Sequence, residues 1–203
     1  MDSVAKHLGP VWSVRWLERE RGTDERGEVL VSTSADGRVV QWTIRKGFES
    51  LVLMKVKRVD KKRGHAAKKD TSRKTESARI SQFAPTTSFD FHPNDGNSYL
   101  IGTEEGIIHR CSCSYNEQTL DSYGGHGGPI YSVKWHPKVQ YVFLSCSEDW
   151  TIQIWHEKHP NAVVVLQSGQ RPIKHVEWSP YNSTIFVAIT DVSIDVWDVT
   201  ASM

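Results

Sequence analysis

The chain has 203 residues, of which 38% are hydrophobic and 24% are charged, with a formal net charge of +1. This composition is typical of a globular protein, and its balanced charge excludes a global attraction to nucleic acid or membranes. Three cysteines are too few for a disulfide framework and favour a reducing compartment. The apolar stretches are far shorter than the roughly 20 residues of a membrane helix, and the start lacks a signal-peptide pattern.

Four segments of the sequence align with one another. Each has a strand-like stretch that ends in an aromatic residue and, further on, an acidic residue in a turn. The aromatic residues are Trp16, Phe91, Trp135 and Trp178, and the acidic residues are Asp36, Glu105, Asp149 and Asp191. The last three acidic residues recur at roughly 40–45 residues, the period of a propeller blade. Alternating stretches such as IYSVKW (130–135) predict short β-strands between polar turns.

These repeats predict an all-β protein, a WD-type β-propeller with about four blades. We expect a first blade at 1–54, a basic insertion at 55–79 and further blades at 80–122, 123–166 and 167–203, all within one propeller domain. Four blades suit an open arc better than a closed ring. We therefore expect an incomplete propeller and a partial polypeptide, with strand edges exposed at its ends.

Two of the segments contain a His–Ser–Asp–Trp set at matching offsets. The first set is His7, Ser34, Asp36 and Trp42, and the second set is His126, Ser147, Asp149 and Trp155. A carboxylate, an imidazole, a hydroxyl and an indole N–H can satisfy one another's hydrogen-bonding groups when they are buried together. We therefore expect a structural tetrad in each of these two blades.

The other two segments depart from this pattern. In the second segment Cys111 stands where the tryptophan is expected, and in the fourth Ile189 and Gly169 stand in place of the serine and the histidine. These blades should depend more on apolar packing than on a polar network.

The tetrads resemble those of the WD-repeat family. Three longer stretches, SADGRVVQWTIRKG (34–47), residues 102–137 and FLSCSEDWTIQIW (143–155), resemble axonemal dynein intermediate chains, and among these the inner-arm type of the two-headed dynein. The resemblance implies a non-catalytic scaffold in the cytoskeleton of a cilium or flagellum. The implied partners are the dynein heavy chain and other dynein intermediate or light chains. The alternative is a WD-repeat scaffold of a cytoplasmic transport or signalling complex.

The insertion at 55–79 is strongly basic, with eleven Lys or Arg against three Asp or Glu. We expect a solvated loop, and the alternative is an electrostatic contact with an acidic partner such as tubulin. The candidate partner contacts are Lys61, Lys62, Arg63, Lys68, Lys69, Arg73 and Lys74 in this insertion and Trp150 in a turn, with Arg15 and Lys134 as further candidates. The insertion has no aromatic residue to stack on bases, which disfavours nucleic-acid binding.

Two other kinds of site are weighed against a scaffold. His109, Cys111 and Cys113 alternate along one predicted strand, but structural zinc usually has four ligands and no second cysteine pair is present. His126, Ser147 and Asp149 are the residue types of a hydrolase triad, yet the same set recurs in the first segment, as a repeated structural network would. We expect no metal, no cofactor, no small-molecule substrate and no enzymatic activity.

Overall fold

The computed structural model describes residues 6–21, 25–43, 49–58, 82–167 and 169–201. All regular structure in these ranges is β-structure, and the strands form four antiparallel sheets. Within each sheet the strands pair in chain order, so every sheet is a simple meander. This is the layout of a propeller blade.

The four sheets follow one another along the chain. The first sheet contains β1 (Val11–Arg21), β2 (Glu25–Ser34), β3 (Arg38–Thr43) and β4 (Glu49–Lys55). The second contains β5 (Thr86–His92), β6 (Asp95–Thr103), β7 (Ile107–Ser112) and β8 (Asp121–Gly124). The third contains β9 (Ile130–Trp135), β10 (Val142–Ser147), β11 (Thr151–His156) and β12 (Val164–Gln167). The fourth contains β13 (His175–Trp178), β14 (Ile185–Ile189) and β15 (Ile194–Asp198).

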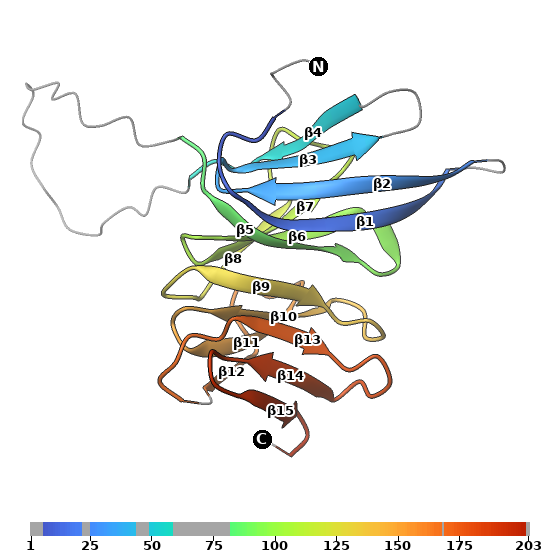
Figure 1. Ribbon diagram of the computed structural model, residues 1–203. Helices are drawn as coiled ribbons and strands as arrows, with labels where there is room; N and C mark the ends of the chain where they lie inside the picture. Colours follow the sequence, from blue (N-terminus) through green and yellow to red (C-terminus); the bar gives the residue numbers. More distant parts are fainter. Residues whose placement is uncertain (1–5, 22–24, 44–48, 59–81, 168, 202–203) are drawn as a thin grey trace, which may run out of the picture.

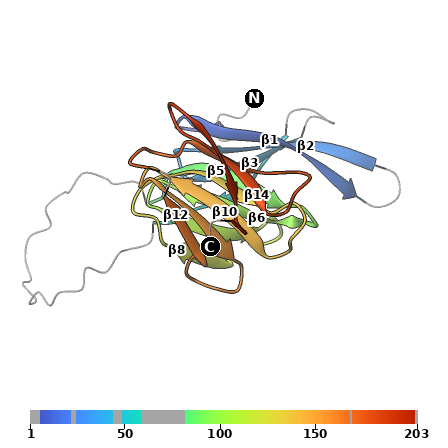
Figure 2. The ribbon, with the colours of Figure 1, turned by 90° about the horizontal axis from the view of Figure 1, so that it is seen from below.

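The sheets are stacked like the blades of a fan. Their first strands, β1, β5, β9 and β13, contact one another in sequence and form the inner edge of the stack. Figure 1 shows the first and fourth sheets at opposite ends, so the ring is open. In the view along the stack the sheets overlap, and the long β1–β2 hairpin projects beyond the other strands (Figure 2). The prediction of an all-β, four-bladed open propeller is confirmed.

Apolar side chains between neighbouring sheets form the core. One cluster joins the first and second sheets, one joins the second and third, and one joins the third and fourth. Because side chains alternate along a strand, a sheet in the middle of the stack contributes to a cluster on each of its faces. In β10, for example, Phe143 packs toward the second sheet and Leu144 toward the fourth.

The basic insertion lies almost entirely outside the described residues. Its first residues belong to the fold, because Lys55 ends β4, Val56 is buried and Lys57 forms an isolated bridge with Phe83. The candidate contacts Lys61, Lys62, Arg63, Lys68, Lys69, Arg73 and Lys74 lie outside the described residues, so contact between this insertion and tubulin stays a prediction.

A tight turn at the same end of each of the first three sheets requires a left-handed backbone. Gly37 and Gly106 adopt φ values of 76° and 78° there, and Trp150 adopts 70° at the corresponding place. A Cβ at Gly106 would lie 2.5 Å from the carbonyl oxygen of His126 in the loop that enters the third sheet. Glycine therefore permits close packing of this turn against the next sheet.

We expect Gly106→Ala to lower the free energy of unfolding by about 2 kcal/mol or more, because alanine is strained at positive φ and its methyl group meets the His126 carbonyl. Urea unfolding followed by tryptophan fluorescence measures the change. Gly96→Ala is the matched control, since a Cβ there meets nothing within 4 Å. Equal stabilities of the two variants would contradict this account of the turn.

Candidate functional site

The third sheet holds a continuous chain of buried hydrogen bonds. The indole Nε1 of Trp155 donates to Ser145 Oγ at 2.8 Å, and Ser145 Oγ lies 2.7 Å from His126 Nε2. His126 Nδ1 lies 3.1 Å from an Asp149 carboxylate oxygen. With the imidazole proton on Nδ1, every group has a partner: indole to hydroxyl, hydroxyl to Nε2, and Nδ1 to carboxylate. These hydrogen bonds connect the loop that enters the third sheet to the turn between β10 and β11.

The carboxylate at the end of this chain also organises the backbone. Asp149 accepts the backbone N–H groups of Gly127 and Thr151 and the Thr151 hydroxyl, at 2.7, 3.0 and 2.7 Å. Burial raises the pKa of Asp149, but these hydrogen bonds and His126 outweigh it and hold the pKa below its ordinary value. Burial lowers the pKa of His126 despite the nearby carboxylate, so the imidazole is neutral in the folded protein at neutral pH.

The first sheet repeats the arrangement. Trp42 Nε1 donates to Ser32 Oγ at 2.8 Å, Ser32 Oγ lies 2.7 Å from His7 Nε2, and His7 Nδ1 lies 3.2 Å from Asp36. In this sheet the Arg38 guanidinium also forms an ion pair with the Asp36 carboxylate, at 2.7 Å. The first and third sheets therefore contain the same four residue types in the same hydrogen-bonded arrangement.

The prediction that Ser34 and Ser147 belong to the tetrads is wrong. The hydroxyls that bridge histidine and tryptophan belong to Ser32 and Ser145, whereas Ser34 and Ser147 donate to the carbonyls of Gly9 and Gly128. The physical reason is the strand register. Trp155 pairs with Phe143, so its indole reaches the side chain two residues further along β10, which is Ser145. Ser147 ends β10 and accepts the Asp149 N–H, stabilising the turn.

Sheets two and four lack the tetrad, as expected. Strand pairing places Ile101 and Cys111 where the third sheet has Ser145 and Trp155, so an apolar pair replaces a polar one in the second sheet. In the fourth sheet Ala188 occupies the serine position, rather than Ile189. Trp197 Nε1 is consequently buried without a hydrogen-bond partner among the described residues.

The geometry opposes catalysis at the tetrad. Ser145, His126 and Asp149 are connected in the order of a hydrolase triad, but Ser145 is fully buried and its oxygen already accepts the Trp155 indole. A nucleophile must reach a substrate, and this hydroxyl has no path to one. The expected triad member, Ser147, is equally buried and engaged with Gly128.

Strand β7 contains His109 and Cys111, and both side chains are buried in the core. His109 is buried and bonded to Ser122 Oγ at 2.8 Å, and burial lowers the pKa of His109 to about 4. Burial raises the pKa of the Cys111 thiol, which keeps it protonated. Within the described ranges no three His, Cys, Asp or Glu residues are grouped as metal ligands.

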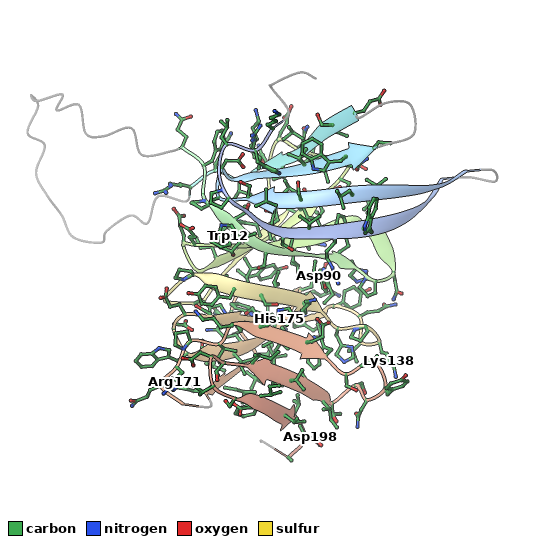
Figure 3. All side chains as sticks on the ribbon, viewed as in Figure 1. Trp12, Asp90, Lys138, Arg171, His175 and Asp198 are labelled. Atoms are coloured by element: carbon green, nitrogen blue, oxygen red, sulfur yellow. The ribbon has the colours of Figure 1, made fainter. Side chains whose placement is uncertain are left out.

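Charged residues on the inner strands link successive sheets, a feature that the sequence reading missed. The residue before each terminal aromatic is Arg15, Asp90, Lys134 and Glu177 in turn, with alternating sign. Arg15 forms an ion pair with Asp90, and Lys134 Nζ lies 2.6 Å from Glu177. Asp90, buried near the middle of the stack (Figure 3), also accepts the backbone N–H of Trp135 at 2.8 Å. The alternation of charge sign at these four equivalent positions was the sequence signal that could have predicted the ion pairs between sheets.

Arg15 and Lys134 lie on inner strands rather than in loops, and each forms an ion pair with the next sheet. Their contact with a partner stays a prediction. Glu177 is also 3.5 Å from His175, which Figure 3 labels on the fourth sheet. Burial raises the pKa of Glu177, but hydrogen bonds from His175 and Lys134 outweigh this and lower it to about 2.

Trp155→Phe should destabilise the protein by about 1–2 kcal/mol more than Trp197→Phe, because only Trp155 loses an indole hydrogen bond. Each indole stacks on the equivalent phenylalanine, Phe143 or Phe186, but Trp155 is fully buried whereas Trp197 is partly buried, which adds to the expected difference. Chemical denaturation of both variants gives the difference. A larger cost for Trp197→Phe would contradict the assigned network.

Acid should weaken the fold as the pH falls from 6.5 toward 4, the window in which His109 binds a proton in the unfolded chain but not in the folded one. The pKa of His109 is about 4 when folded against 6.5 ordinarily, so its contribution is complete above pH 6.5 and is lost as the pH falls toward 4. The loss reaches about 3 kcal/mol near pH 4, because the unfolded chain binds the proton more readily. Urea unfolding between pH 7 and 4 measures it. If the free energy of unfolding of a His109→Gln variant fell as steeply with pH as that of the parent protein, a group other than His109 would be responsible for the loss.

Comparison with known proteins places this geometry in a family. The family model for the WD domain, G-beta repeat, matches residues 117–156, which include the third-sheet tetrad. A solved structure of the WD40 beta propeller domain of Doa1 aligns with a TM-score of 0.65 and 18% identity, over 95% of this chain and 53% of that chain. Across the described ranges, no helix has the length and apolar character that a transmembrane span requires.

Sequence relatives are more specific. Dynein axonemal intermediate chain 4 of Homo sapiens is 48% identical over 97% of this chain, and that of Xenopus laevis is 44% identical over 100%. Dynein intermediate chain 2, ciliary, of Heliocidaris crassispina is 34% identical over 96% of the chain. The chain spans 23%, 27% and 26% of these relatives, about a quarter of their length. It is therefore a WD-repeat homologue of the axonemal dynein intermediate chains.

Proposed function

We propose that this chain is a non-catalytic WD-repeat scaffold of an axonemal dynein complex, located in the axoneme of a cilium or flagellum. Its partners are the dynein heavy chain and other dynein intermediate or light chains. The observation that carries the proposal is the 48% identity to dynein axonemal intermediate chain 4 over 97% of the chain. Assignment to the inner-arm, two-headed dynein goes further than the relatives' names and rests on the sequence resemblance alone.

The chemistry of the described residues supports a scaffold. In two sheets, the His, Ser and Asp side chains that resemble catalytic groups form hydrogen bonds with one another. Such networks rigidify a sheet and fix the turns at its end. Rigid sheets that present turns and loops are suited to protein recognition.

Trp150 is the best candidate for a partner contact among the described residues. It is 41% exposed and holds a left-handed backbone, with φ of 70°, at the place where Gly37 and Gly106 stand in the first two sheets. A bulky residue there costs about 1–2 kcal/mol relative to glycine. A strained, exposed tryptophan on a rigid turn is a typical interface anchor, since tryptophan is enriched among residues that dominate binding energy.

Trp150→Gly should raise the free energy of unfolding by about 1 kcal/mol, because the left-handed strain is relieved. The same change should weaken binding to the dynein heavy chain roughly thirtyfold, as expected for loss of a central aromatic anchor. Thermal unfolding measures the first effect, and quantitative pull-down from a ciliated-cell extract with the tagged chain measures the second.

Tyr181→Ala is the control, because Tyr181 is also an exposed aromatic but lies in the loop between β13 and β14. It should leave recovery of the heavy chain unchanged. Recovery of a transport or signalling complex without any dynein subunit would favour the alternative scaffold. Unchanged binding by Trp150→Gly would remove this residue from the interface without touching the scaffold proposal.

A further inference from the structure

The first sheet differs from the others at the end of its inner strand. In the second, third and fourth sheets this strand ends at the terminal aromatic or one residue later, and a turn that contains proline follows. In the first sheet β1 continues past Trp16 to Arg21 and stays paired with β2 as far as Glu25. The four residue pairs beyond Leu17 extend the hairpin by about 14 Å, at roughly 3.4 Å per residue. This is the β1–β2 hairpin that projects beyond the other strands in Figure 2.

The missing turn leaves a groove between the first and second sheets. In the second and third sheets a histidine of the turn packs on the terminal aromatic of the next sheet. The pairs are His92 with Trp135, whose ring centroids lie 4.7 Å apart, and His136 with Trp178, at 4.5 Å. Both tryptophans are 5% exposed. In the first sheet Leu17 stands in place of the histidine, and Phe91 of the second sheet is only partly buried. The space beside these two residues is a groove of about 700 Å³.

Both walls of the groove come from neighbouring sheets of this chain. Arg15 and Leu17 line it on the first sheet, and Phe91 and Cys113 are among the residues that line it on the second. No Asp or Glu is present among the described residues that line it. Arg15 forms an ion pair with Asp90, and the Arg15 side chain is still 43% exposed. The groove therefore presents apolar surface beside an accessible cation.

Strand alternation separates the charges of the hairpin by sign. On β2, Val29 and Val31 belong to the core cluster between the first and second sheets. Their partners on β1 are Leu17 and Arg15, so this face of the hairpin is the one toward the second sheet and the groove. Every second position along each strand lies on the same face. The charged positions on the face toward the groove are Arg15, Arg19, Arg21 and Glu25, and those on the opposite face are Glu18, Glu20, Arg26 and Glu28. The face toward the groove is therefore the basic one.

We propose that this groove binds an extended, acidic segment of a partner protein. Carboxylates of the segment pair with the arginines on the basic face of the hairpin, and one apolar side chain packs on Leu17 and Phe91. Opposite charge selects an acidic segment over a basic one. The groove has apolar surface as well as charge, which favours a peptide over a purely anionic ligand. The proposal goes beyond the scaffold function and does not depend on the dynein assignment.

Fluorescence anisotropy of a labelled, glutamate-rich peptide with one central phenylalanine tests the proposal. The peptide should bind the 203-residue chain. Arg19→Glu should raise the Kd at least about fivefold, because it reverses a charge on the face toward the groove. Arg26→Glu is the matched control, since it makes the same change on the same hairpin but on the opposite face. At about 0.15 M salt, where charges are screened beyond about 8 Å, it should change the Kd by less than about twofold.

Alkylation of Cys113 locates the bound peptide. Cys113 is partly exposed in the groove, whereas Cys111 and Cys146 are buried, and burial raises the pKa of both buried thiols and keeps them protonated. Saturating peptide should slow the labelling of Cys113 by iodoacetamide at least about fivefold, as measured by mass spectrometry. A peptide with serine in place of its phenylalanine should bind more weakly, because it lacks the apolar contact with Leu17 and Phe91.

Circular dichroism of each variant establishes that it is folded. No binding of the acidic peptide, or equal weakening by Arg19→Glu and Arg26→Glu, would overturn the proposal. So would a bound peptide that leaves the labelling of Cys113 unchanged, or tighter binding of a lysine-rich peptide of the same length. None of these results alters the recovery of the dynein heavy chain by pull-down, which tests the scaffold function separately.

Discussion

Every sheet of this protein has apolar side chains on both faces, and this constraint governs the structure. A sheet of this kind is stable in water only when another surface covers each face, because exposed apolar area is costly. The second and third sheets meet the requirement through clusters on both sides. Stacking follows from it, and so does the inner edge formed by β1, β5, β9 and β13. The apolar outer faces of the first and last sheets are not covered by the described residues.

Polar groups set the geometry within that apolar frame. In sheets one and three, the tetrads fasten the entering loop to the turn beyond it through His7 or His126. On the inner strands, ion pairs connect the first sheet to the second and the third to the fourth, and Asp90 connects the second to the third by accepting the backbone N–H of Trp135. Apolar burial is non-directional, whereas hydrogen bonds and ion pairs depend on distance and angle. The polar contacts therefore specify the register at which sheets already driven together will pack.

The sheets show two ways of satisfying the same buried position. Ser145 and Trp155 form a hydrogen-bonded pair, while Ile101 and Cys111 replace both members with apolar groups. Either solution leaves no donor unpaired. The fourth sheet replaces only the serine of this pair, with Ala188, and keeps Trp197, which leaves the indole N–H without a partner among the described residues. Removing one partner of a buried pair generally costs more than removing both.

The sequence by itself determined the repeat, the all-β architecture, and the identity of the histidine, aspartate and tryptophan in each network. Those features follow from local spacing, since strands alternate with a period of two and blades recur at a fixed length. Only the tertiary structure decided that Ser32 and Ser145, rather than Ser34 and Ser147, complete the networks, because the pairing between β10 and β11 sets which hydroxyl the indole reaches. It also decided that Arg15 and Lys134 face neighbouring sheets, and that Trp16 and Ile194 stay uncovered. Contacts between sheets join residues far apart in the chain, and spacing along one strand carries no information about them.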